Sequence, residues 1–324
     1  MNLYNFYIAK YNLPFETLTY SSEIPLKKGQ LCSVLIKNNE YLAICASESK
    51  LDSSQIKNLR EIDKVYGFIL TNEQFEFYFK VGFLTFNSFN NLLTLGIKPF
   101  NSLMDSKKNP IYQVNLNSTN TLNDGMDPNI NYNITIDWTK EILTIIMKNQ
   151  YNNILVITPE KKMAKPIIDR IENFLIESTT DNKYIISDLT TTGNKQSKAY
   201  QNIYNQDQKT VNFSNKNELF TTLNPYDHII IIDEANPSYI SESRIYFDTR
   251  EVAYWASKIY NIDVTFISTL PSVRFSSLAS SKLDILCVPQ ITLKFLERTS
   301  KQKDFSNILN ELEDDTRIFG EEME

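Results

Sequence analysis

Short apolar runs separated by turn residues make up the first part of the chain. Residues 3–9, 30–36 and 40–46 are rich in aromatic and aliphatic side chains, a composition typical of β-strands. Lys37-Asn38-Asn39 lies between the last two runs and predicts a hairpin turn. The pattern therefore predicts a small β-rich N-terminal module.

A stretch from Phe75 to Leu95 follows, in which apolar residues recur at helical spacing. Its aromatic members include Phe77, Phe79, Phe83, Phe86 and Phe89. The spacing predicts one helix that packs on the β-rich module. Core packing is the expected role of such a stripe.

The composition then changes between Asn101 and Asn133, where Asn, Ser, Thr, Asp and Pro dominate. This stretch is interpreted as a linker or a long surface loop. Beyond it the pattern predicts alternating strands and helices: strands at 153–158, 184–187, 228–232 and 264–268, and helices at 163–176, 196–204 and 249–260. Such alternation predicts a parallel sheet with helices on both faces and ligands at the carboxyl ends of its strands.

Charge is distributed unevenly along the chain. The net charge is −6, and seven acids against one arginine from Glu311 onward account for all of it. Because the rest is neutral, we expect any DNA contact to be local rather than a broad basic face. The acidic end is a solvated tail or a partner-binding tail. Without a membrane-length apolar run or a signal peptide, the chain is expected to be cytoplasmic.

The metal-ligating residue types are few. Cys32, Cys45 and Cys287 are too scattered for a disulfide framework or a four-thiolate zinc site, so we expect buried, reduced thiols. His228 is the one histidine and is expected to be an ordinary residue at a strand edge. The sequence therefore predicts no metal site.

Two carboxylates follow the most apolar strand. Residues 229–232 are four isoleucines, and Asp233 and Glu234 come directly after them. This is the Walker B arrangement, in which the aspartate holds a Mg²⁺-bound water and the glutamate polarises the attacking water. The pair alone is a weak signal, because apolar strands often end in acids by chance.

Three further motifs follow the acid pair: Ser238-Tyr239, Thr249-Arg250-Glu251-Val252-Ala253 and Ser268-Thr269-Leu270-Pro271-Ser272. Their order and spacing resemble the PriA family of replication-restart helicases, and residues 154–160 and 211–220 agree with it upstream. The resemblance covers roughly residues 130–285. It implies an α/β fold with a RecA-like parallel-sheet lobe and 3′–5′ helicase activity that uses ATP and Mg²⁺. Ser268, Thr269 and Leu270 would occupy the place of the family's Ser-Ala-Thr coupling motif.

The N-terminal part resembles the same family's domain that captures the 3′ end of a DNA strand, on Pro14 to Tyr20 and Gly29 to Val34. The resemblance carries DNA binding over to Leu18, Thr19, Tyr20, Lys37 and Lys57. Three of these depart from the family, because Leu18 replaces a stacking aromatic, Thr19 an aspartate and Lys37 a glycine. We therefore expect weak binding to forked or single-stranded DNA.

The phosphate-binding loop of the family is missing from the sequence. Such a loop needs glycines and a lysine, but no glycine lies between Gly125 and Gly193. Lys140 is either a remnant of the loop or a solvated helix lysine. The acidic box also departs from the family at Ala235 and Asn236, and the residues after Ser272 are too few for a second lobe and a zinc module.

The expected organisation is a DNA-binding-like domain at 1–100, a linker at 101–133, a degenerate RecA-like lobe at 134–290 and an acidic tail at 291–324. The leading interpretation is a catalytically inactive, PriA-like DNA-binding protein with no cofactor, whose partners are DNA and replication-restart proteins. The alternative is an ATPase with an unconventional or shared nucleotide site.

Overall fold

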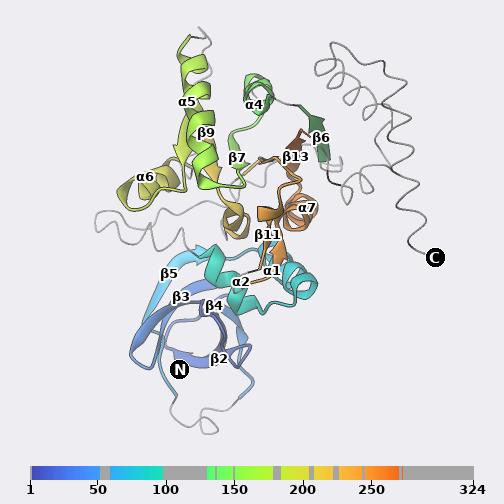
Figure 1. The fold of residues 1–324 in the computed structure, drawn as a ribbon. Coiled ribbons are helices and arrows are strands. Elements are labelled where there is room, and N and C mark those ends of the chain that lie inside the picture. Colours follow the sequence, from blue (N-terminus) through green and yellow to red (C-terminus); the bar gives the residue numbers. More distant parts are fainter. Residues whose placement is uncertain are drawn as a thin grey trace, which may run out of the picture. The chain divides into compact units, whose positions relative to one another are not determined.

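The computed structural model describes residues 2–51, 59–97, 130–135, 137–148, 150–177, 184–203, 208–221, 226–242, 245–269 and 272. Residues 1–270 form one unit that holds two large sheets (Figure 1). Of the predicted linker, only 130–133 lies within the described residues, and the predicted tail lies outside them. The predicted domain boundaries therefore stay predictions.

The N-terminal sheet is antiparallel and has five strands, in the order β2-β1-β4-β3-β5. Its strands are β1 (Asn2–Ile8), β2 (Leu18–Ser22), β3 (Gln30–Ile36), β4 (Asn39–Glu48) and β5 (Lys64–Ile69). Ile36 pairs with Asn39, so Lys37 and Asn38 alone form the hairpin loop. Both have positive φ angles, 47° and 65°, as a tight hairpin turn requires. The predicted hairpin and the β-rich character of this part are confirmed.

Two of the three cysteines lie in the core of this sheet. Cys32 and Cys45 are buried and free. Burial raises the pKa of the Cys32 thiol to about 12 and that of Cys45 to about 11, so both stay protonated and unreactive at neutral pH. The expectation of buried, reduced thiols is confirmed for these two, whereas Cys287 lies outside the described residues.

The predicted single helix over 75–95 is wrong in one respect, because two helices occupy this stretch: α1 (Asn72–Thr85) and α2 (Phe89–Gly96). Phe86 adopts a left-handed backbone conformation that ends α1, and Ser88 caps α2. The predicted core role also fails for three aromatics, since Phe79, Phe83 and Phe86 are exposed.

The second sheet has six strands, all of them parallel, in the order β6-β13-β10-β7-β9-β8. They are β6 (Ile130–Ile134), β7 (Asn153–Ile157), β8 (Tyr184–Asp188), β9 (Lys209–Ser214), β10 (His228–Ile232) and β13 (Asp263–Ser268). The predicted parallel sheet is confirmed. Two strands were not predicted: β6, which begins inside the predicted linker, and β9.

Helices cover both faces of this sheet. On one face α4 (Trp138–Met147) and α5 (Lys161–Glu177) pack on side chains such as Val156 and Ile230. Leu155 and Ile231 are also buried but alternate with these, so they lie on the opposite face, where α7 (Thr249–Tyr260) is found (Figure 1). Another helix of the described residues, α6 (Asn194–Ile203), follows β8.

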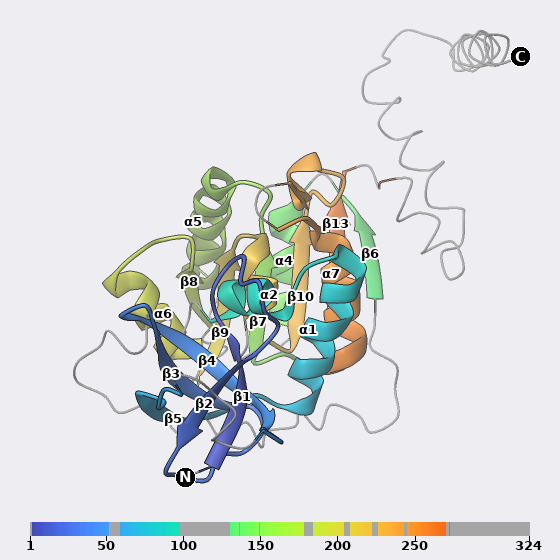
Figure 2. The ribbon, with the colours of Figure 1, turned by 90° about the horizontal axis from the view of Figure 1, so that it is seen from below.

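Aromatic side chains of α1 link the N-terminal sheet to the parallel sheet within the unit 1–270, and α1 runs beside α7 (Figure 2). The Phe77 and Tyr260 ring centroids are 5.1 Å apart, and the buried Tyr78 hydroxyl donates to the carbonyl of Phe220 in the short helix η2 (Lys216–Phe220). Among the described residues, no helix is both long and apolar enough to cross a bilayer.

Candidate functional site

Asp233 lies directly after β10, at the carboxyl end of the strand, as predicted. Its backbone has a positive φ of 54°, and its carboxylate accepts a 2.8 Å hydrogen bond from the Asn236 side-chain amide. Asn236 in turn caps the short helix η3 (Pro237–Tyr239). Asp233 is half-buried, so it is the member of the acid pair whose carboxylate could still meet a hydrated cation.

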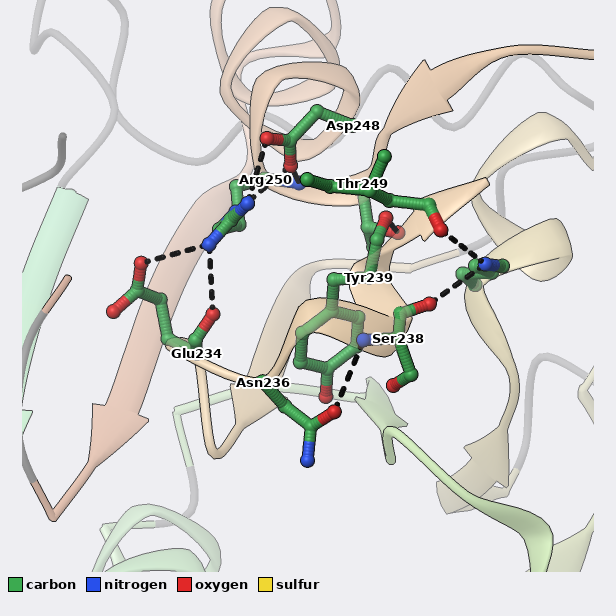
Figure 3. Close-up of polar contacts among 9 residues, drawn as sticks. Glu234, Asn236, Ser238, Tyr239, Asp248, Thr249 and Arg250 are labelled. Atoms are coloured by element: carbon green, nitrogen blue, oxygen red, sulfur yellow. Dashed lines mark hydrogen bonds and ion pairs between the residues drawn. The ribbon is translucent and has the colours of Figure 1, made fainter. Parts of the chain in front are cut away.

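The Glu234 carboxylate is not placed to meet a hydrated cation. It is fully buried, and its carboxylate lies 3.6 Å from the Arg250 guanidinium of α7. Arg250 also donates to the Glu234 carbonyl oxygen, and its Nη2 donates to Asp248 at 2.8 Å (Figure 3). One buried cation is therefore held between two buried carboxylates.

Burial and neighbouring charges shift the pKa values of Arg250 and Tyr132 in this cluster. Burial lowers the pKa of Arg250, but the hydrogen bonds and charge of Asp248, together with the charge of Glu234, outweigh it and raise the pKa above its ordinary value. Burial also raises the pKa of the Tyr132 hydroxyl on β6, and the nearby charge of Glu234 raises it further. Because Glu234 faces a cation and a phenol inside the protein, it does not reach solvent to polarise an attacking water.

The segment after the acid pair covers the carboxyl ends of β7 and β10. The Tyr239 hydroxyl lies between the carbonyl oxygens of Ile157 and Ile232, the last residues of these strands. The ammonium group of Lys216 donates to the carbonyls of Ser238 and Ile240, at 2.7 and 3.2 Å. The chain's own polar groups therefore occupy this part of the crevice where ligands of parallel sheets bind.

The connection between β6 and α4 joins a strand and a helix of the parallel sheet, and it is where the sequence resemblance would put a phosphate-binding loop. Only residues 135–137 lie between Ile134 and Trp138. The loop motif, by contrast, places six residues from its first glycine to its second and then a lysine. Asp137 caps α4, because its carboxylate accepts a 3.1 Å hydrogen bond from the backbone N–H of Lys140. A negative charge of the protein thus sits where a helix N-terminus would bind phosphate.

Lys140 itself is exposed on α4.

No family model matches this sequence, and no curated protein matches it.

Of the three residues predicted to occupy the place of a coupling motif, Ser268 ends β13 and Thr269 follows it. Ser268 is buried, and its carbonyl accepts a 2.9 Å hydrogen bond from the backbone N–H of Thr135, which follows β6. Thr269 is partly exposed, and Leu270 lies outside the described residues. Ser268 thus closes the ladder between neighbouring strands.

The predicted DNA-binding positions gather partly at one end of the N-terminal sheet. Leu18, Thr19 and Tyr20 begin β2, where Thr19 donates to the Asn5 side chain at 2.8 Å. The Tyr20 hydroxyl donates to the carbonyl of Leu35, two residues before the exposed Lys37. Lys57 lies outside the described residues.

His228 begins β10 and is buried, with its Nε2 atom 2.8 Å from the Thr265 hydroxyl. Burial lowers its pKa to about 4, although Asp263 opposes the shift. Sequence reasoning placed it at a strand end but gave no signal of this burial. The described residues hold no group of three or more His, Cys, Asp or Glu side chains arranged for a metal ion.

Proposed function

We propose that the chain is a PriA-like protein that binds DNA in replication restart or DNA repair and does not hydrolyse ATP. The proposal that the chain does not hydrolyse ATP rests on the buried ion pair between Glu234 and Arg250. A Walker B glutamate must reach a water next to the γ-phosphate, whereas this one is neutralised inside the protein.

The relation to a RecA-like helicase lobe is supported by two features taken together. The motifs from Asp233 to Ser272 follow the family's order, and the first and last of them begin where strands of a parallel sheet end. Asp233 and Ser268 end neighbouring strands, β10 and β13, which pair along their length. Both residues are therefore at the carboxyl edge, where this class of sheet binds its ligands.

Loss of ATP hydrolysis is supported by the acid that caps α4. Phosphoryl transfer needs backbone amides and a lysine around the phosphates. Asp137 instead offers a carboxylate to the first turn of α4, and it would repel a triphosphate at this position. The short β6–α4 connection leaves no room for a loop that wraps the phosphates.

The DNA half of the proposal rests on the N-terminal sheet. Lys37 is exposed at the tip of the β3–β4 hairpin, and the Tyr20 hydroxyl binds the backbone beside it. An exposed lysine at this hairpin tip supports a local contact with phosphate, and the zero net charge of the chain before Glu311 argues against a broad basic surface. We therefore propose forked or single-stranded DNA as a weakly bound partner, with replication-restart proteins as the second partner class.

Fluorescence anisotropy with labelled forked DNA tests the proposed DNA binding. We expect binding at micromolar levels or weaker, with little preference for a free over a blocked 3′ hydroxyl. Lys37→Glu should weaken binding and lower the dependence of log K on log salt by about one. Lys165→Glu makes the same charge change at an exposed position of α5 and should have no such effect.

Three outcomes would each contradict a part of this account. Equal loss of binding in both lysine variants would show that Lys37 is not a local contact. Absence of binding at low salt would remove the DNA partner altogether. A strong preference for the free 3′ end would contradict the expected lack of preference and show that the domain keeps end capture.

A further inference from the structure

An aromatic stripe on the solvent side of α1 is unexplained by the proposed function. Phe79, Phe83 and Phe86 are 46%, 80% and 97% exposed, and Phe15 from the β1–β2 loop is 61% exposed. With about 200 Å² for a fully exposed phenylalanine side chain, these fractions amount to roughly 550 Å² of apolar surface. An apolar patch of this size is at the upper end for a monomer, and patches of this kind are often functional.

The patch surrounds a groove of about 560 Å³. Its lining consists of Leu13, Pro14, Phe15, Glu16, Tyr78, Phe79, Gly82, Phe83, Phe86, Asn87, Ser88 and Phe89. One wall is the C-terminal half of α1, and the other is the loop at 13–16. The buried Asn90 side chain anchors that loop, since it donates to the carbonyls of Phe15 and Glu16 at 3.1 and 2.9 Å. The groove is therefore preformed.

Phe86 is held out of the protein by a strained turn. Its φ of 54° is in the left-handed region, which is costly for a bulky residue, and a glycine is usual at this position of a helix end. Gly82 permits the turn, because a Cβ atom there would lie 2.8 Å from the Asn87 carbonyl oxygen. A strained and almost fully exposed phenylalanine adds little to the stability of a single copy, which favours a role in a contact outside it.

We propose that a second copy of this chain occupies the groove in a two-fold symmetric dimer. The same patch offers a projecting side chain, Phe86, and a cavity of its own, as a self-complementary interface requires. Two such patches would bury about 1,100 Å² of aromatic surface, which reaches the roughly 1,000 Å² expected of a specific interface. Apart from Glu16, the described residues that line the groove carry no charge, so they offer no cation to the phosphates of a polyanion.

Sedimentation velocity of the full chain from low to high micromolar concentration tests the proposal. We expect a reversible monomer–dimer equilibrium, with the dimer lost in Phe83→Glu and Phe86→Glu. Phe174→Glu is the matched control, because Phe174 is 42% exposed on α5, outside this groove. It should dimerise as the parent does. A parent that stays monomeric, or a control that loses the dimer equally, overturns the proposal.

A second variant separates association from folding. Phe86→Gly removes the projecting ring and relieves the left-handed strain, so the folded monomer should unfold at the same or higher urea concentration while the dimer is lost. If Phe86→Gly dimerises like the parent, the ring is not part of the interface and the proposal fails. Benzophenone placed at position 86 should photocross-link two copies, and failure to do so counts against the symmetric arrangement.

Discussion

The Arg250 guanidinium of α7 lies 3.6 Å from the Glu234 carboxylate that follows β10, and both side chains are buried. A second carboxylate, Asp248, holds the other side of the guanidinium. This arrangement turns a pair of acids that resembles a catalytic motif into a structural tie between the sheet and α7. Its consequences for stability can be measured without any knowledge of a ligand.

Arg250→Met should destabilise the protein strongly, by about 3–5 kcal/mol in the free energy of unfolding, because it leaves two buried carboxylates without their cation. Glu234→Gln should cost less, since Arg250 keeps Asp248. Urea unfolding followed by circular dichroism measures both.

Lys258→Met is the control, because Lys258 is exposed on the same helix and its loss should stay within about 0.5 kcal/mol. The account is contradicted if Arg250→Met costs no more than this control. Additive effects of the Arg250 and Glu234 variants would likewise show that the two side chains do not interact.

The acid at the start of α4 yields a second prediction. Asp137→Ala removes the carboxylate that accepts from the Lys140 amide and should destabilise the protein by about 1 kcal/mol. Asp169→Ala, at an exposed position inside α5, should not lose a cap and should change stability less. Equal effects in thermal or urea unfolding would mean that Asp137 does not cap the helix.

Periodicity predicted the parallel sheet because its central strands are unbroken apolar runs, and β10 was predicted with its observed bounds. β6 was missed because Ile130-Asn131-Tyr132-Asn133-Ile134 continues a polar stretch and has too few apolar residues to indicate a strand. The single helix over 75–95 failed because the left-handed turn at Phe86 is not visible in an apolar pattern.

The candidate site could be predicted only in part. Asp233 at a strand end could be predicted from four isoleucines followed by acids. The partner of Glu234 could not, because Arg250 is distant along the chain and approaches only when α7 packs on the sheet. The exposure of Phe83 and Phe86 was missed for a related reason, since periodicity finds a stripe but does not say which side of the helix meets the core.

His228 predicts a dependence of stability on pH. Its pKa is about 4 in the folded protein because burial disfavours the charged imidazolium, and its ordinary value is 6.5. The unfolded chain therefore binds the proton more readily, so stability is full above pH 6.5 and falls as the pH drops from 6.5 toward 4. The loss between pH 7 and pH 5 should be on the order of 2 kcal/mol.

Urea unfolding at pH 7 and pH 5 measures this loss, and His228→Gln is the comparison because a glutamine does not titrate in this range. The variant should lose distinctly less stability on acidification than the parent, whatever its stability at pH 7. The same loss in both proteins would show that His228 is not the responsible group.

The proposed absence of ATP hydrolysis is tested most directly by phosphate release from ATP and Mg²⁺, with and without forked DNA. The account predicts no release above background in the parent protein and no change in Glu234→Gln. Asp233→Asn should likewise leave DNA binding unchanged, because the Asp233 carboxylate bonds Asn236 in the turn after β10, far from the predicted DNA-binding positions in the sequence. DNA-stimulated phosphate release that disappears in Glu234→Gln would contradict the central claim, because it would require Glu234 to act on a nucleotide that the buried pair with Arg250 keeps from it.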